Sequence, residues 1–81
     1  MLESPYQRKI IARYEKMGYY VIKMAKTNKN GIPDLIALKP NHVIFIEVKG
    51  AKTTHSPLQK FRKRELEALG FTVEVERLLK T

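Results

Sequence analysis

The sequence predicts an α/β domain whose elements follow one another in the order helix, three strands, helix, strand. Two observations lead to this prediction. The pattern Ser-Pro-x-Gln occurs twice, at residues 4–7 and 56–59, and each copy opens an amphipathic stretch that ends at a glycine. Four short runs rich in β-branched and aromatic residues fill the remainder, separated by Gly, Pro, Asn and Thr. No repeat or linker divides residues 1–81, which we therefore expect to form a single domain.

Each Ser-Pro-x-Gln pattern has the features of a helix start. Serine stands at the N-cap, proline at the first helical position, and glutamine three residues after the cap, where it can complete a capping box. The first helix should run from Pro5 to a stop at Gly18, with an inner face formed by Tyr6, Ile10, Ile11, Tyr14 and Met17. The second should run from Pro57 to about residue 69, before Gly70, with apolar members Leu58, Phe61, Leu66 and Leu69.

The strand-like runs cover residues 19–25, 34–38, 43–48 and 71–75. Residues 39–42, Lys-Pro-Asn-His, form a four-residue loop suited to a hairpin, so the second and third strands should be antiparallel. The last strand follows a helical crossover, which we expect to be right-handed, and should run parallel to the third. Both faces of the hairpin are apolar, so helices should flank a mixed four-stranded sheet on both sides.

Three charged residues, Asp34, Glu47 and Lys49, interrupt these apolar runs. If Leu38 lies opposite Val43, then Asp34 lies directly opposite Glu47, and Lys49 shares their face of the sheet. Burying such charges is costly and indicates a functional reason. Two opposed carboxylates can hold Mg²⁺ or Mn²⁺, and a neighbouring lysine can offset charge on a phosphodiester that is being cut.

The charge balance points to a polyanionic partner. Sixteen Lys and Arg against eight Asp and Glu give a formal net charge of +8, which favours nucleic acid. The basic side chains expected to contact DNA lie in two loops and on the flank of the second helix: Lys26, Lys29, Lys52, Lys60, Lys63 and Arg64. The chain has no cysteine, no apparent signal peptide and no membrane-spanning run, so we expect a soluble protein acting in the cytoplasm, that of the host if it is phage-encoded.

The motifs together resemble the PD-(D/E)XK nuclease superfamily, and most closely its virus-type replication-repair nuclease (VRR-NUC) branch. The resemblance covers nearly the whole chain and is carried by Glu3, Gln7, Gly31-Ile32-Pro33-Asp34, Glu47-Val48-Lys49-Gly50 and Ser56-Pro57-Leu58-Gln59. It implies a restriction-endonuclease-like core. It also implies that Asp34, Glu47 and the main-chain carbonyl of Val48 bind the metal, that Lys49 serves catalysis, and that Glu3 and Gln59 complete the site. Stand-alone members, commonly of phage origin, look like homodimers that cut four-way junctions, so the resemblance favours a Holliday junction resolvase-like endonuclease.

Other interpretations of these residues stay open. Asp34 could be a turn residue after a proline, Glu47 and Lys49 could protect an edge strand, and Gln59 could serve only the capping box. Glu3 could be present simply because a carboxylate is favourable near a helix N-terminus. The two histidines, His42 and His55, are expected to be surface or capping residues rather than metal ligands, although His55 could still touch a phosphate. For the whole chain, the alternatives are a non-catalytic nucleic-acid-binding module that keeps the nuclease fold and a sequence-specific restriction-type nuclease.

Overall fold

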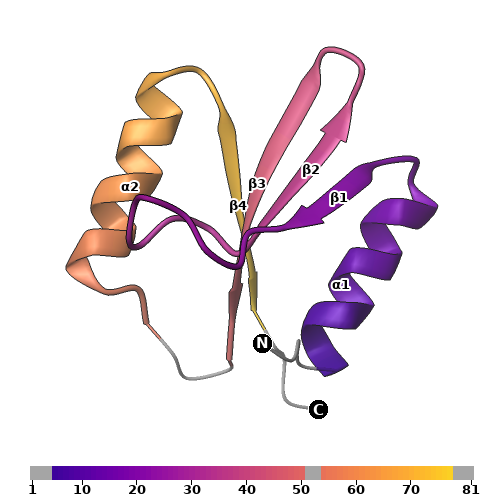
Figure 1. Ribbon diagram of the computed structural model, residues 1–81, viewed down its shortest axis with the longest axis horizontal. Coiled ribbons are helices and arrows are strands. Elements are labelled where there is room, and N and C mark those ends of the chain that lie inside the picture. Colours follow the sequence, from indigo (N-terminus) through magenta and orange to yellow (C-terminus); the bar gives the residue numbers. More distant parts are fainter. Residues whose placement is uncertain (1–4, 51–53, 78–81) are drawn as a thin grey trace.

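The computed structural model describes residues 5–50 and 54–77 and contains the expected order of elements (Figure 1). The helices and strands are α1 (Pro5–Lys16), β1 (Tyr20–Lys23), β2 (Leu35–Lys39), β3 (His42–Lys49), α2 (Pro57–Ala68) and β4 (Thr72–Arg77). The fold class predicted from the sequence, αβββαβ with a four-stranded mixed sheet, is confirmed. Within the described part of the chain, neither helix has the length and apolar character that crossing a membrane requires.

The four strands form one sheet in the order β1-β2-β3-β4. β1, β2 and β3 are antiparallel to their neighbours, and β4 runs parallel to β3, as expected. The predicted pairing of Leu38 with Val43 is also confirmed. The central position of β3 follows from this order and argues against an edge-strand role for the charges that it carries.

Two details of the strands differ from the sequence-based expectation. The β2–β3 hairpin turn has two residues and not four, because Lys39 pairs with His42, and Asn41 takes the positive φ of 58° that such a tight turn needs. β4 continues to Arg77, two residues beyond the expected end, because the parallel ladder with β3 extends to Lys49. The second difference changes the composition of the site.

The core lies between α1 and one face of the sheet. Ile10 and Tyr14 of α1 pack with alternate residues of β2 and β3: Leu35, Ala37, Ile44 and Ile46. Because side chains alternate along a strand, the remaining positions of β3, which include Glu47 and Lys49, belong to the opposite face, on the side of α2. Met17 was expected on the inner face of α1, but it follows the last helical residue and is 49% exposed.

The second helix covers its face of the sheet only in part, which corrects the expectation that helices shield both sides. None of its residues is buried, and the apolar side chains of Leu58, Phe61 and Leu69 are 40%, 48% and 70% exposed. The loop between β1 and β2 reaches across to α2 (Figure 1), where Arg62 Nε donates a hydrogen bond to the carbonyl of Asn30 at 2.9 Å. The loop is therefore one of the close neighbours of α2.

Candidate metal and catalytic site

Asp34 is held at the start of β2 by two hydrogen bonds to neighbouring strands. Its carbonyl accepts from Met24 N at 2.8 Å, just beyond the end of β1, and its carboxylate Oδ2 accepts from Val48 N, also at 2.8 Å. The first bond fixes the backbone and the second fixes the side chain against β3. The carboxylate is thereby brought to the charged end of β3, one position beyond the last β2–β3 pair, Leu35 with Ile46.

Glu47 lies beside Asp34 and is almost completely buried, with 3% of its surface exposed. The pKa of Glu47 is raised from 4.5 to about 8, first by burial, then by the hydrogen bond that the protonated Glu47 donates to the Asp34 carboxylate, and then by the charge of Asp34, while Lys49 acts in the opposite direction. Two carboxyl groups this close cannot both ionise without cost unless a cation joins them. Glu47 therefore holds a proton in the metal-free protein at neutral pH.

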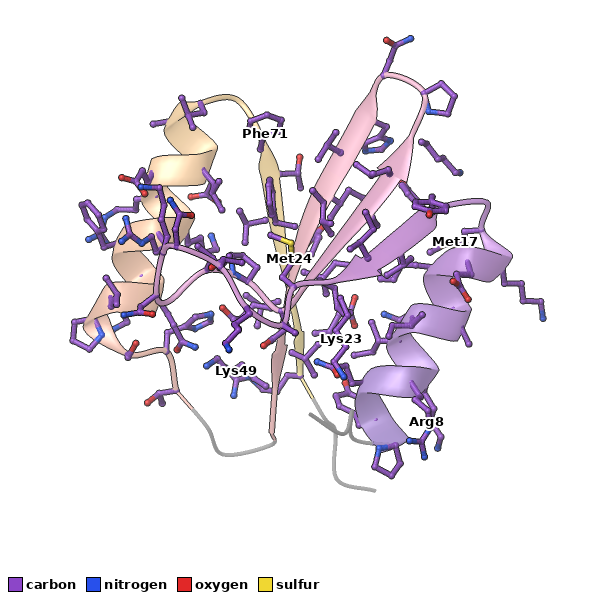
Figure 2. The ribbon with its side chains drawn as sticks, in the orientation of Figure 1. Arg8, Met17, Lys23, Met24, Lys49 and Phe71 are labelled. Atoms are coloured by element: carbon purple, nitrogen blue, oxygen red, sulfur yellow. The ribbon has the colours of Figure 1, made fainter. Side chains whose placement is uncertain are left out.

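Lys49 connects this pair to the start of α2. Its side chain is 7% exposed, and Nζ donates to Gln59 Oε1 at 2.7 Å. The same oxygen accepts from Ser56 N at 2.9 Å, while Ser56 Oγ accepts from Gln59 N at 3.1 Å, which completes the capping box. Gln59 thus caps the helix and contacts the buried ammonium group at the same time, so its two predicted roles are compatible. Figure 2 shows Lys49 on the side of the sheet that faces α2.

The chemistry of this donor set fits a divalent cation. Asp34 and Glu47 supply oxygen ligands, which Mg²⁺ and Mn²⁺ prefer, and the proton on Glu47 is the charge that a cation would replace. The described residues include no group of three or more His, Cys, Asp or Glu side chains suited to a metal. Glu3, the expected further ligand, lies outside the described residues. The carbonyl of Val48, the other expected metal ligand, lies in β3 between Glu47 and Lys49.

The described basic residues that were expected to contact DNA lie in the β1–β2 loop and on α2. Lys26 and Lys29 are exposed in the β1–β2 loop, and Lys60 and Arg64 are exposed on α2. Lys63 is partly neutralised by an ion pair with Glu67 at 2.7 Å. Lys52 lies outside the described residues. Gln7, which was expected to face inward on α1, is half-buried.

Two residues near Lys49 were not assigned to the site from the sequence. Arg77 is the β4 partner of Lys49 and donates from Nη1 to the carbonyl of Gly50 at 3.1 Å. His55 immediately precedes the N-cap of α2, and its Nε2 is buried without a hydrogen-bond partner in the described structure. The parallel β3–β4 register could have revealed Arg77, but the sequence-based strand stopped at Val75. No pattern in the sequence marks His55. The other histidine, His42, lies in the exposed hairpin beside the Tyr19 hydroxyl, as expected of a surface residue.

Three known families or proteins that resemble this chain have names that refer to resolvases or nucleases. Residues 4–73 match the family model of the archaeal Holliday junction resolvase, Hjc. A protein of Acyrthosiphon pisum secondary endosymbiont phage 1, named "Putative nuclease p44", is 30% identical over 74 residues, which cover 90% of this chain and 80% of the phage protein. A solved structure titled "VRR_NUC domain" superposes with a TM-score of 0.77 at 29% identity and covers 88% of this chain and 78% of that one.

The sequence match and the fold lead to the same family. The chain belongs to the archaeal Holliday junction resolvase (Hjc) family, and it is a VRR-NUC-like nuclease domain of the PD-(D/E)XK type.

Proposed function

We propose that residues 1–81 act as one domain that hydrolyses DNA phosphodiester bonds with Mg²⁺ or Mn²⁺, cuts branched DNA such as four-way junctions, and works as a homodimer in the cytoplasm of a host cell. The single observation that carries the chemical part is the half-buried carboxylate of Asp34 beside the buried carboxyl group of Glu47 and the buried side chain of Lys49. Such a pair is costly to keep in a small domain unless it serves a cation.

Each residue of the site has a distinct task in this proposal. Asp34, Glu47 and the carbonyl of Val48 hold the cation, with Glu3 as a further ligand. The bound cation polarises the scissile phosphate and lowers the pKa of an attacking water. Lys49, oriented by Gln59 Oε1 at 2.7 Å, offsets the charge that develops on the phosphate oxygens. The hydrogen bond from Val48 N to Asp34 keeps the aspartate in position before the cation arrives.

The DNA part of the proposal rests on charge and on the family. A net charge of +8 on 81 residues attracts the phosphate backbone, and the exposed lysines of the β1–β2 loop and α2 offer contacts to it. The matched family carries the name of a Holliday junction resolvase, which supports a four-way junction as the preferred branched substrate. A four-way junction presents strands related by approximate two-fold symmetry, so two identical sites related by a two-fold axis suit it.

The surface for a second copy is the outer side of α2. A hollow of about 500 Å³ lies between α2 and the β1–β2 loop, and its apolar lining includes Ile32, Leu66 and Leu69. Arg62 and Glu65 at its margin carry opposite charges, so the same patch on a second copy could complement it, as a two-fold contact requires. A second copy would also cover apolar side chains that the single chain leaves exposed.

Cleavage of labelled substrates tests the activity. The protein is incubated with a four-way junction, a flap and a linear duplex of the same sequence, each with Mg²⁺, with Mn²⁺ or with chelator. We expect cutting of the junction that needs the cation. Binding of the junction without cutting under every metal condition would indicate a non-catalytic module, and cutting of the linear duplex at one fixed sequence would indicate a restriction-type enzyme. Either result overturns the proposal.

Sedimentation of two matched variants tests the dimer. Leu69→Asp places a charge on the α2 surface, and Tyr20→Asp places one on the β1 edge, where the native side chain is equally exposed, at 71% against 70%. We expect the wild type and Tyr20→Asp to sediment as dimers and Leu69→Asp as a folded monomer that makes no paired cuts in a junction. A monomeric wild type, or a dimeric Leu69→Asp that still makes paired cuts, would contradict this surface.

A further inference from the structure

The buried nitrogen of His55 is not used by the catalytic site described above. Its Nε2 is buried and has no hydrogen-bond partner in the described structure, which is unusual because buried polar atoms are nearly always paired. Leaving such an atom unpaired costs folding free energy. A ligand that accepts or donates a hydrogen bond there would remove that cost.

The charged groups around His55 are cationic. Burial lowers the pKa of His55, and the charges of Lys49, Arg77, Lys63 and Lys60 lower it further, in that order. Lys63 pairs with Glu67 at 2.7 Å, and Lys49 lies close enough to Glu47 to lower the pKa of that carboxyl group. Arg77 is anchored to the carbonyl of Gly50. An unpaired nitrogen beside several positive charges favours an anion as its partner.

This cluster lies next to the catalytic site. His55 directly precedes Ser56, whose backbone N–H shares the Gln59 Oε1 acceptor with Lys49 Nζ, at 2.9 and 2.7 Å. On the other side, Arg77 is paired with Lys49 in the β3–β4 ladder. An anion bound at His55 would therefore be separated from the catalytic lysine by only a few side chains.

We propose that His55, Arg77 and Lys60 form a second phosphate subsite, which holds a non-scissile phosphate of the same DNA strand while Asp34, Glu47 and Lys49 act on the scissile one. The inference rests on the proposed function, because it takes the anion to be a DNA phosphate. His55 Nε2–H donates to a non-bridging oxygen of that phosphate, and Arg77 and Lys60 supply charge. The subsite would fix the position of the strand relative to the cut, so His55 acts as a positioning residue.

A methylphosphonate scan tests the subsite. Junctions carrying one neutral methylphosphonate at each position around the cut are bound in chelator, so that no cleavage occurs, by the wild type, by His55→Ala and by His42→Ala. We expect one non-scissile position at which neutralisation weakens wild-type and His42→Ala binding about tenfold but leaves His55→Ala binding almost unchanged. Lys60→Ala, an exposed substitution, should reduce the sensitivity at the same position. If every position behaves alike in the wild type and in His55→Ala, the subsite does not exist.

Imidazole ¹⁵N spectra give an independent readout in the unaltered protein. The chain has only two histidines, and His42, in the exposed hairpin, serves as an internal control. Junction binding in chelator should shift the His55 Nε2 resonance and leave that of His42 in place; an unchanged His55 resonance would overturn the proposal. If the wild type cuts no DNA while the scan still shows the His55-dependent position, the proposed function fails and the subsite stands. If the wild type cuts DNA and the scan shows no His55-dependent position, the proposed function stands and the subsite fails.

Discussion

Replacing Glu47 by glutamine should abolish metal-dependent cutting and, at alkaline pH, make the metal-free protein more stable. Glu47 is 3% exposed and lies beside the Asp34 carboxyl group, so its ionisation places a second negative charge in a buried site. Glutamine is neutral at every pH and can donate an N–H to Asp34, as the protonated glutamic acid does. It removes the ionisation cost together with the cation ligand.

The size of the effect follows from the pKa of Glu47, which is about 8 in the folded chain and 4.5 without the surrounding structure. Because the folded state holds its proton more tightly, the free energy of unfolding of the wild type falls as pH rises from 4.5 to about 8, and the loss is complete above that pH. A shift of this size corresponds to at most about 5 kcal/mol. Solvent and side-chain relaxation reduce it, and we expect Glu47→Gln to exceed the wild type by about 2–3 kcal/mol at pH 9, with little difference near pH 4.5.

Denaturant unfolding of both proteins in chelator at several pH values measures this difference. Glu74→Gln is the matched control, because Glu74 is an exposed carboxylate on the neighbouring strand; this variant keeps Glu47, so its stability should change with pH as that of the wild type does. Saturating Mg²⁺ at pH 8 should stabilise the wild type and leave Glu47→Gln unaffected. A stability difference that is the same at pH 5 and pH 9, or equal stabilisation of both proteins by Mg²⁺, would refute the reasoning.

Two further comparisons separate structural from catalytic effects. Ser56→Ala and Gln59→Ala should each lower the free energy of unfolding by about 1 kcal/mol, measured with denaturant, because each breaks the capping box. Only Gln59→Ala should also lower kcat for junction cleavage, because it removes the contact to the Lys49 ammonium group. Equal kcat values for the two variants would assign Gln59 to the cap alone. Gly31→Ala should lower the melting temperature more than Gly70→Ala. Both glycines have positive φ, but a Cβ at Gly31 would also lie 2.7 Å from Leu58 Cγ, whereas a Cβ at Gly70 would meet nothing within 4 Å. Equal decreases in melting temperature would show that Leu58 moves aside.

The sequence was a good guide where local patterns decide the structure. The capping residues located the start of α2, and the hairpin register followed from its apolar alternation. The charges of Asp34 and Glu47 were expected to lie together, and the structure joins them through a hydrogen bond. These features depend on neighbours a few residues apart or on one antiparallel pair, so a linear pattern contains them.

The sequence-based predictions were wrong where segments far apart in the chain pack against each other. The end of β4 at Arg77 is set by the length of β3, which no pattern within β4 shows. The amphipathic pattern of α2 indicates an apolar stripe but not how much of it the sheet covers, and most of the stripe stays exposed. Strand ends and helix coverage depend on packing between elements far apart in the chain, which periodicity does not encode.

The sequence by itself determined the fold class and identified the charged trio proposed as the site, because charges inside apolar strands and capped helix starts are local properties. Only the tertiary structure decided how the trio is supported. Folding brings the backbone of residue 48 to Asp34 and the cap glutamine, Gln59, to Lys49. It also pairs the end of β4 with Lys49. It also leaves a buried histidine nitrogen unpaired among cations. Each of these contacts joins segments that are close only in space, and their energies exist only once the elements have packed together.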